Sequence, residues 1–423
     1  MAGTAAVLAA CGPAPVPPPP LLPDPSSPRT IVVIVADDMR FDYRGLLAHL
    51  DAASWIDCVN AAIEVPMCGP SRAAMFTGRY SSRTGVIGNS YTYLMNDTDT
   101  IATRIHAQGY KTVLSGKYLN DFPWPAAPAP FRRSSTYVPP GWDVWNADGS
   151  ATFIQNLNGA WATDYVFQFA TDQVLATPAT TPMFLWLGPT DPHLPANPPA
   201  RHAQDQPPLP AKAPSYNEAD VSDKPPSRQF PLLSKSVQAA IDVDRIGIAR
   251  CLLGVDDGLK QLFDALAATG RLATAHLFFL SDNGYLLGEH RMVKKGEAYD
   301  EASRVPFMAR WPGVAGRTEQ GVIGSVDLSA TVCALAGTTA PGTDGVNLAP
   351  LLARGTPVHQ DFVYIEPPGG GWNAMRSGSI KYVEYGDGTR ELYDLVADPY
   401  EMNNLAKVRD LNLYSARLAQ LKP

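Results

Sequence analysis

The chain has 423 residues, of which 45% are hydrophobic and 18% are charged, and its net charge is −7. This length allows one large domain with a substantial core and a smaller one beside it. The acidic balance argues against a nucleic-acid partner, because binding to phosphates requires a basic face.

Residues 1–29 predict an N-terminal segment that precedes the folded domain. Leu8-Ala9-Ala10-Cys11 resembles the cleavage box of a bacterial lipoprotein, whose cysteine carries the lipid anchor. The Pro-rich residues 13–28 would then form an extended tether. We therefore expect an exported protein, in the periplasm or at the cell surface and anchored through Cys11. A disordered Ala/Pro tail is the alternative.

Four apolar, partly β-branched runs predict buried parallel strands, and two segments of helical spacing predict helices. The strands are expected at 30–36, 111–115, 181–188 and 275–281, and the helices at 100–108 and 242–269. This alternation indicates an α/β fold with a large, mainly parallel sheet flanked by helices. Ligands of such sheets bind beyond the carboxyl ends of the strands.

The remaining segments predict a loop excursion and a second, smaller domain. Residues 195–231 are rich in Pro, Asp and Ser, and their length favours a lid or substrate wall. Residues 381–385 and 391–395 flank Gly-Asp-Gly-Thr-Arg and predict an antiparallel hairpin, followed by a helix at 411–421. We expect a catalytic domain at 30–345 and an α+β subdomain with an antiparallel sheet at 346–423.

The five cysteines are widely spaced and follow no zinc-binding pattern. They predict no disulfide framework, although one pair could form in an exported protein. Cys68 lies in a distinctive segment, Met-Cys-Gly-Pro-Ser-Arg at 67–72, followed by Thr-Gly-Arg at 77–79. From the residues alone it is a nucleophile, a metal ligand, half of a disulfide, or the precursor of a modified residue.

Carboxylates at two strand ends indicate a metal site. Asp37 and Asp38 follow the first strand, and Asp282 and Asn283 follow the last. An all-oxygen set suits Ca²⁺ or Mg²⁺, whereas zinc would require His or Cys. Without a cation, three buried carboxylates would repel one another and their pKa values would rise. Helix caps or turns are the alternative for either pair alone.

Four further side chains could bind a tetrahedral oxyanion beside that metal. Arginine offers a rigid fork of donors, and lysine offers a compact charge. The candidates are Arg72, Lys117, His193 and Lys295. Taken singly, each of these residue types more often has a surface or packing role. Together they indicate a metal-assisted hydrolase of sulfate or phosphate esters, without choosing between the two.

From residue 30 onward the sequence resembles the type I sulfatases, which have the alkaline-phosphatase-like fold. Residues 68–79 look like their signature, Cys-x-Pro-Ser-Arg followed by Thr-Gly-Arg. Further matches are Val35-Ala-Asp-Asp38, Gly116-Lys117, Asp191-Pro-His193, Ser281-Asp-Asn-Gly-Tyr285, Leu287-Gly-Glu-His290 and residues 295–306 and 392–405. Residues 116–120, 139–143 and 217–225 are similar to the branch that contains N-acetylglucosamine-6-sulfatases and heparan sulfatases.

The resemblance implies a modified nucleophile. A formylglycine-generating enzyme would read Cys68, Pro70 and Arg72 and oxidise Cys68 to Cα-formylglycine. One hydroxyl of the hydrated aldehyde would attack the sulfur of a sulfate monoester, and the second would then expel sulfate. The substrate would be a sulfated carbohydrate or an aryl sulfate, and the enzyme class would be a sulfuric ester hydrolase.

The resemblance also implies a role for each candidate. Calcium is the usual ion, with Mg²⁺ as the alternative, and its ligands would be Asp37, Asp38, Asp282, Asn283 and the modified Cys68. Arg72 would hold the formylglycine hydrate and the charge on the metal side, and Lys117 and Lys295 would clamp sulfate oxygens. His193 would either protonate the leaving alcohol or bind a further sulfate oxygen. His290 is a further catalytic candidate, with a packing histidine as the alternative.

One position departs from the family pattern. Leu119 stands where many sulfatases carry a histidine two residues after the lysine. Two other functions remain open: a phosphonate or phosphodiester hydrolase that uses the same formylglycine and metal, and a non-catalytic surface-bound relative with a broken site.

Overall fold

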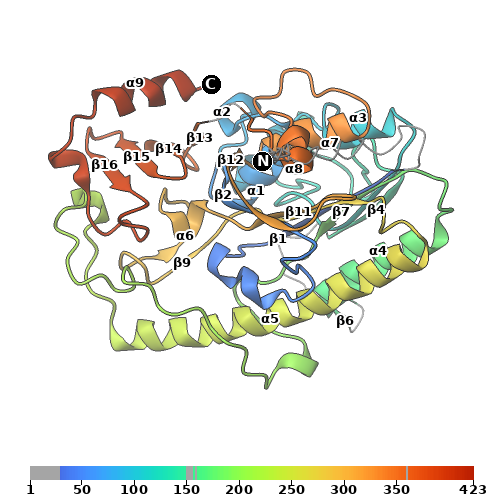
Figure 1. Ribbon diagram of the computed structural model, residues 1–423, viewed down its shortest axis with the longest axis horizontal. Helices are drawn as coiled ribbons and strands as arrows, with labels where there is room; N and C mark the ends of the chain where they lie inside the picture. Colours follow the sequence, from blue (N-terminus) through green and yellow to red (C-terminus); the bar gives the residue numbers. More distant parts are fainter. Residues whose placement is uncertain (1–28, 149–155, 158–159, 359–360) are drawn as a thin grey trace, which may run out of the picture.

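The computed structural model describes residues 29–148, 156–157, 160–358 and 361–423. They form a large α/β unit and a smaller C-terminal unit beside it (Figure 1). The predicted lipoprotein box and all but the last residue of the predicted N-terminal segment lie outside the described residues.

The central sheet of the large unit has eight strands in the order β12-β2-β11-β8-β1-β7-β3-β4. β11 pairs antiparallel with both of its neighbours, and the other pairs are parallel. The strands are β1 (Thr30–Ala36), β2 (Ile56–Ala62), β3 (Lys111–Lys117), β4 (Val144–Asp148), β7 (Met183–Gly188), β8 (His276–Ser281), β11 (Phe307–Arg310) and β12 (Arg317–Gly324). The predicted α/β class with a mainly parallel sheet is confirmed.

Helices cover both faces of this sheet, as Figure 1 shows. Successive strand residues point to opposite faces, so Val33 and Val35 enter one core cluster while Val32 and Ile34 enter the other. Helices α1 (Cys68–Thr77), α3 (Ile101–His106), α7 (Asp327–Leu335) and α8 (Ala349–Arg354) line the first cluster, and α4 (Ala162–Ala176) and α5 (Lys235–Ala268) line the second. Both faces of β1 are therefore buried in hydrophobic core.

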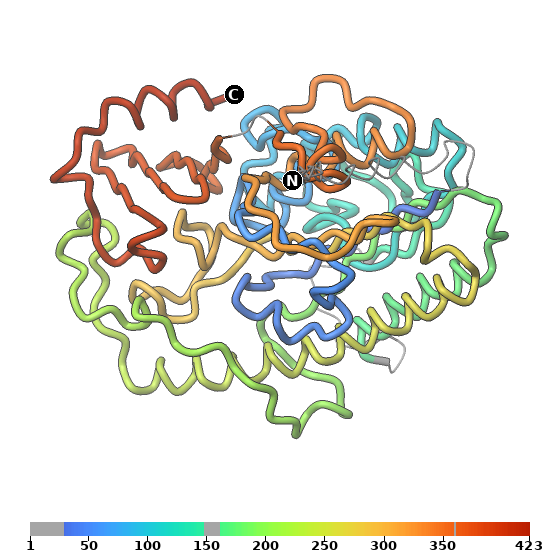
Figure 2. Tube along the Cα trace, in the orientation of Figure 1, coloured from blue at the N-terminus to red at the C-terminus, as the bar shows by residue number. Residues whose placement is uncertain are grey.

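The C-terminal unit contains the predicted antiparallel sheet, in the order β13-β14-β15-β16. Its strands are β13 (Val363–Ile365), β14 (Trp372–Arg376), β15 (Ile380–Tyr385) and β16 (Arg390–Asp394), and α9 (Asn412–Leu421) packs on it through Leu418. Figure 2 follows the chain from the large unit into this sheet and on to the C-terminus. The domain boundary after residue 345 stays a prediction; Leu351 and Leu352 of α8 pack in the core of the large unit.

Two elements differ from the expected bounds for local reasons. α5 begins at Lys235, well before residue 242, because the Ser234 side chain accepts from the backbone N–H of Val237 and caps the helix. β3 continues to Lys117 through Gly116, where φ is +95° and a Cβ would lie 2.3 Å from the Gly188 carbonyl oxygen. Only glycine allows this close approach.

Short elements complete the description. They are α2 (Ser81–Thr84), α6 (Asp300–Ser303), β5 (Asn156–Leu157), β6 (Ala160–Trp161), β9 (Leu286–Leu287), β10 (Val293–Lys294) and the 3₁₀ turns Phe41–Leu46, Asn89–Leu94, Ala129–Phe131, Ala200–His202, Pro226–Arg228 and Leu405–Lys407. Between residues 195 and 231 the chain holds only two of these turns, as the loop prediction requires.

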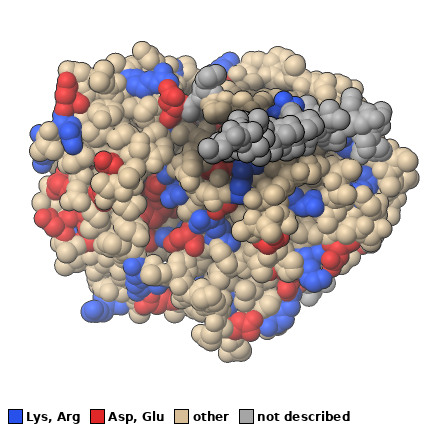
Figure 3. Space-filling view, viewed as in Figure 1, with Lys and Arg blue, Asp and Glu red and all other residues tan. Residues whose placement is uncertain are grey.

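The surface of the molecule carries charges of both signs. The face shown in Figure 3 carries acidic and basic side chains interspersed. In the part of the chain that the structure describes, no helix has the length and apolar character needed to cross a membrane.

Candidate active site

Cys68 is the first residue of α1 and is buried next to the end of β1. Its Sγ lies 3.5 Å from Asp37 Oδ1 and 3.7 Å from Asp38 Oδ1. Lys295 Nζ lies 2.8 Å from the same sulfur. The N-terminus of a helix favours a negative charge or an electron-rich oxygen at this position. The first turn of α1 therefore delivers Cys68 into a cluster of charged groups.

Asp37 and Asp38 leave β1 where the backbone turns sharply. Asp38 has φ +59°, an uncommon conformation for a residue with a side chain. Its backbone N–H donates to Asp282 Oδ1 at 3.1 Å, which connects the ends of β1 and β8. The turn aims both aspartates at Cys68, and backbone strain of this kind is concentrated at functional sites.

Asp282 and Asn283 follow β8 and are fully buried. Arg72 lies one helical turn after Cys68, and its Nε donates to Asp282 Oδ2 at 2.7 Å. The Nη1 of Arg72 donates to the carbonyl of Lys117 at 3.0 Å. Arg72 is thus a fully buried cation that joins α1 to the ends of β8 and β3.

Two lysines and a histidine complete the cluster. Lys117 Nζ lies 2.5 Å from Asp37 Oδ2, and Lys295 Nζ lies 2.5 Å from Asp38 Oδ1. His193 Nε2 lies 3.3 Å from Asp38 Oδ2. Except for His290, the structure brings together every candidate residue that the sequence singled out.

The charges of the cluster control its protonation. Burial raises the pKa of Asp37, but Lys117, His193 and Arg72 outweigh this effect and hold it below its ordinary value. Burial lowers the pKa of both lysines, but Asp38 raises that of Lys295 well above normal, and Asp37 raises that of Lys117. Burial raises the pKa of the Cys68 thiol. At neutral pH the site therefore holds the Asp37 carboxylate, the Lys117 and Lys295 ammonium groups and a neutral Cys68 thiol.

The residues fit a hard divalent cation. Asp37, Asp38, Cys68 and His193 bring potential ligand atoms within 4.8 Å of one another. Asn283 Oδ1 is buried and has no hydrogen-bond partner among the described residues, as expected of an oxygen that binds a cation. Asp37, Asp38 and Asp282 balance Arg72, Lys117 and Lys295. A divalent cation would make the site net positive and suited to an anionic ester.

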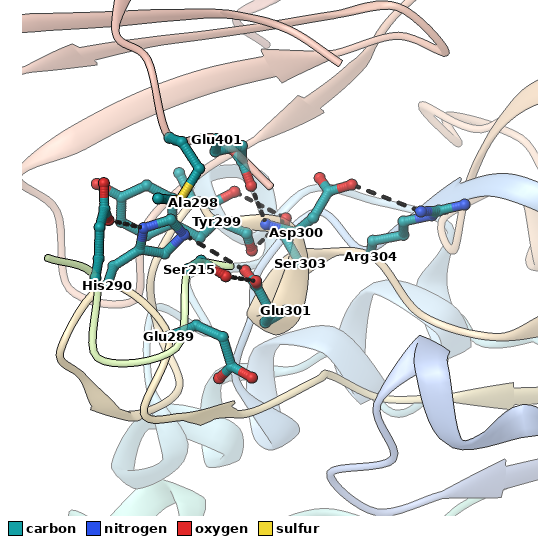
Figure 4. Close-up of polar contacts among 12 residues, drawn as sticks. Ser215, Glu289, His290, Ala298, Tyr299, Asp300, Glu301, Ser303, Arg304 and Glu401 are labelled. Carbon is teal, nitrogen blue, oxygen red and sulfur yellow. Dashed lines mark hydrogen bonds and ion pairs between the residues drawn. The ribbon is translucent and has the colours of Figure 1, made fainter. Parts of the chain in front are cut away.

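The structure places His290 outside this cluster. Its Nδ1 lies 2.8 Å from Glu218 Oε2, and its ring stacks on Tyr299 with centroids 4.0 Å apart. In Figure 4 the ring points toward Glu301 and Glu401. Glu401 is itself ion-paired with Lys381 at 2.9 Å. These contacts favour the packing role for His290, because its ring is held by Glu218, Glu301 and Tyr299 and not by Cys68 or its neighbours.

Sequence reasoning assigned no role to two residues that support the site. Asp191 is buried; its carbonyl accepts from the N–H of Asp37, and its carboxylate accepts from Thr163. Burial raises the pKa of Asp191 to about 7. Asn89 accepts from the N–H of Gly69, beside Cys68. The position of Asp191 after a strand was a usable signal, whereas nothing local marks Asn89.

Comparison with known families agrees with this geometry. The family model described as Sulfatase matches residues 29–338, and one described as N-sulphoglucosamine sulphohydrolase, C-terminal, matches residues 288–421. The first match covers more than half of the chain. The chain belongs to the sulfatase family, which confirms the resemblance to type I sulfatases, and the expected class of sulfuric ester hydrolase agrees with it.

Individual members of the family share between 25% and 28% of aligned residues with this chain in the three examples that follow. The N-acetylglucosamine-6-sulfatase of Bos taurus is 25% identical over 84% of this chain and 74% of its own length. The choline-sulfatase of Rhizobium meliloti is 28% identical over 81% of this chain and 73% of its own length. A Caenorhabditis elegans homologue of the extracellular sulfatases is 25% identical over 77% of this chain, and the match spans only 49% of that protein.

Solved structures show the same fold at low identity. A protein crystallised with its substrate D-glucosamine-2-N,6-O-disulfate has a TM-score of 0.75 at 20% identity, covering 93% of this chain and 97% of that one. The phosphonate monoester hydrolase of Agrobacterium radiobacter also has a TM-score of 0.75 at 20% identity, covering 93% and 95%. At this identity the likeness establishes the fold alone.

Proposed function

We propose that Cys68 is converted to Cα-formylglycine and that the matured protein hydrolyses a sulfate monoester with the help of a bound divalent cation. The observation that carries this proposal is the position of Cys68. Its sulfur contacts Asp37, Asp38 and Lys295 at once, at the start of a helix. A nucleophilic oxygen at this position would lie beside both the cation ligands and a lysine donor.

The chemistry of the unmodified thiol supports a precursor role. A cysteine nucleophile needs a lowered pKa, because the thiolate is the reactive form. Burial does the opposite at Cys68 and raises its pKa. A formylglycine hydrate needs no thiolate, and it supplies one hydroxyl for attack and a second for release of sulfate.

The other residues would bind the ion and stabilise charge. The ligands would be Asp37, Asp38, Asp282 and Asn283, and the ion, Ca²⁺ or else Mg²⁺, would supply Lewis-acid activation. Lys117 and Lys295 would donate to sulfate oxygens as negative charge develops in the transition state. Arg72 would hold Asp282 in place through its buried ion pair.

His193 is the proposed proton donor to the leaving alcohol. Its Nε2 faces Asp38, and its Nδ1 lies 2.5 Å from the carbonyl of Leu194, which orients the ring. Leu119, by contrast, packs in the hydrophobic core and offers no proton carrier. Among the described residues, His193 is therefore the imidazole placed to serve both steps of the reaction.

We also propose a class of substrate, a partner during maturation and a location for the protein. The substrate class is a sulfated glycan, supported by relatives named for N-acetylglucosamine-6-sulfate and ulvan. A formylglycine-generating enzyme would be the partner during maturation. Export to the periplasm or cell surface is supported by the Drosophila melanogaster relative named as an extracellular sulfatase homologue. The lipid anchor at Cys11 rests on the lipoprotein-like box of the sequence alone.

Phosphonate or phosphodiester hydrolysis is the alternative within the same fold. Matched sulfate, phosphonate and phosphodiester esters of 4-nitrophenol separate the two reactions. A higher kcat/KM for the sulfate supports the proposal, and a strong preference for phosphorus would replace it.

The test of the proposed function is the variant Cys68→Ala, produced together with a formylglycine-generating enzyme. We expect it to lose hydrolysis of 4-nitrophenyl sulfate. Cys58→Ala is the matched control, because Cys58 is equally buried but lies within the sheet. Unchanged activity in Cys68→Ala would refute the mechanism and leave a non-catalytic role for the site.

A further inference from the structure

A large cavity lies next to the segment that holds Cys68. Gly69 donates its backbone N–H to Asn89 Oδ1 at 2.9 Å, and a Cβ on Gly69 would lie 2.6 Å from Thr92 Cγ2. Thr92 Oγ1 in turn accepts from the indole N–H of Trp124 at 2.9 Å. These contacts connect the loop at residues 89–94 to the loop at residues 121–128, and they connect the first of these loops to Gly69, the residue after Cys68.

The cavity between these loops has a volume of about 650 Å³ and is lined by Ser90, Tyr91, Tyr93 and residues 121–128. This volume is typical of sites for small organic ligands. One wall of the cavity is formed by residues 90–93 and the other by residues 121–128. The second of these walls begins at Asp121, four residues after Lys117, and four residues span at most about 14 Å. This wall of the cavity therefore starts within about 14 Å of Lys117, one residue of the Cys68 cluster.

Four of the eleven lining residues are aromatic. Phe122 and Trp124 are each 3% exposed, and their ring centroids are 5.0 Å apart, so that they hold each other in place. Tyr93 packs on Phe131 at 5.2 Å. Tyr91 is 44% exposed and offers a ring to a ligand. Rigid aromatic faces with few polar groups suit a ligand that is itself a ring.

The charge of the cavity restricts the ligand further. Asp121 is exposed and lines the cavity, while none of the described lining residues is Lys, Arg or His. Arg132 supports the wall from outside the lining, where it donates to the carbonyl of Ala127 at 2.7 Å. A carboxylate accepts hydrogen bonds from hydroxyl and ammonium groups and repels a second sulfate or a carboxylate on the ligand.

We propose that this cavity binds the leaving group of the sulfate ester and selects a pyranose ring that carries no anionic group besides the scissile sulfate. A hexosamine with a free amine fits best, with its ring against Tyr91 and its hydroxyl or ammonium groups near Asp121. The inference rests on the proposed function of the Cys68 site. It makes Tyr91 and Asp121 specificity-determining residues that take no part in the chemical step.

The test compares two sugar substrates that differ by one sulfate: D-glucosamine 6-O-sulfate and D-glucosamine-2-N,6-O-disulfate. The matured full chain should prefer the monosulfate by about tenfold in kcat/KM, which corresponds to ~1.4 kcal/mol. Asp121→Asn, which tolerates the positive φ at this position, should reduce that preference at least threefold, roughly half of the energetic difference. Tyr91→Ala should raise KM for both sugars by roughly tenfold without changing the ratio.

Controls separate the inference from the function on which it rests. Hydrolysis of 4-nitrophenyl sulfate reports the chemistry at Cys68, and Tyr400→Ala removes an equally exposed tyrosine outside the cavity. The inference is overturned if the disulfate is preferred, if Asp121→Asn leaves the ratio unchanged, or if the aryl sulfate is hydrolysed but neither sugar is. Failure with all three esters would instead refute the proposed function.

Discussion

Replacement of Lys295 by alanine should remove most of the catalytic rate. Lys295 Nζ lies 2.8 Å from Cys68 Sγ and 2.5 Å from Asp38 Oδ1. It therefore reaches the atom that would become the nucleophile and one carboxylate of the ion site. Loss of one positioned donor to a developing oxyanion costs about 2.7–4 kcal/mol, or roughly 10² to 10³ in kcat. We expect Lys295→Ala to fall in this range.

The neighbouring lysine provides the matched control. Lys294 is 42% exposed and pairs with Glu297, and its ammonium lies 5.4 Å from the ring centroid of Phe230. Lys294→Ala should retain activity within about twofold, because exposed pairs contribute little. The assay is turnover of an aryl sulfate at equal formylglycine content. A Lys295→Ala rate within threefold of the unmodified sequence, or an equal loss in both variants, would refute the assignment.

Three further predictions test the site and its surroundings. Asp282→Ala should abolish hydrolysis and lower the free energy of unfolding by about 3–5 kcal/mol in urea titrations, because Arg72 loses its buried partner. The control is Asp257→Ala at an exposed position, which should change the free energy of unfolding by less than about 1 kcal/mol. Equal losses of stability in the two variants would contradict the reasoning. His290→Ala should destabilise the fold by about 2 kcal/mol yet keep kcat within threefold; a hundredfold loss in folded protein would return His290 to the active site. Burial raises the pKa of Glu64 to about 8, so the carboxyl is protonated in the fold and ionised in the unfolded chain between about pH 4.5 and 8. The contribution of Glu64 to the free energy of unfolding is complete below its unfolded pKa and is lost as pH rises through about 8, by up to ~1.4 kcal/mol per pH unit. In urea titrations, Glu64→Gln should make the free energy of unfolding fall less steeply with pH. An unchanged slope in the variant would show that Glu64 is ionised in the fold.

The strand ends were the most informative part of the sequence. Asp37 and Asp38 follow a run of apolar residues that can only be a buried strand, and a parallel sheet brings such ends to one edge. The contacts among Asp38, Asp282 and Lys295 follow from this rule together with the family motifs. The rule needs no knowledge of the loops.

His290 shows where the sequence was insufficient. Its motif places it near the site along the chain, but φ of +50° at His290 and its bond to Glu218 turn the ring into a different charged cluster. The partner residues Glu218 and Glu401 lie far away in sequence, so no local pattern could reveal them. The aromatic cavity could not be predicted from the sequence either, because Thr92 and Trp124 connect two loops whose relative position is known only from the fold.

The most direct test of the account is the mass of the proteolytic peptide that contains Cys68, taken from a preparation that hydrolyses a sulfate ester. The account predicts a lighter peptide, in which an aldehyde oxygen has replaced the thiol sulfur, and a chemical label specific for aldehydes should attach at residue 68. An active preparation in which this peptide carries only the unmodified thiol would contradict it.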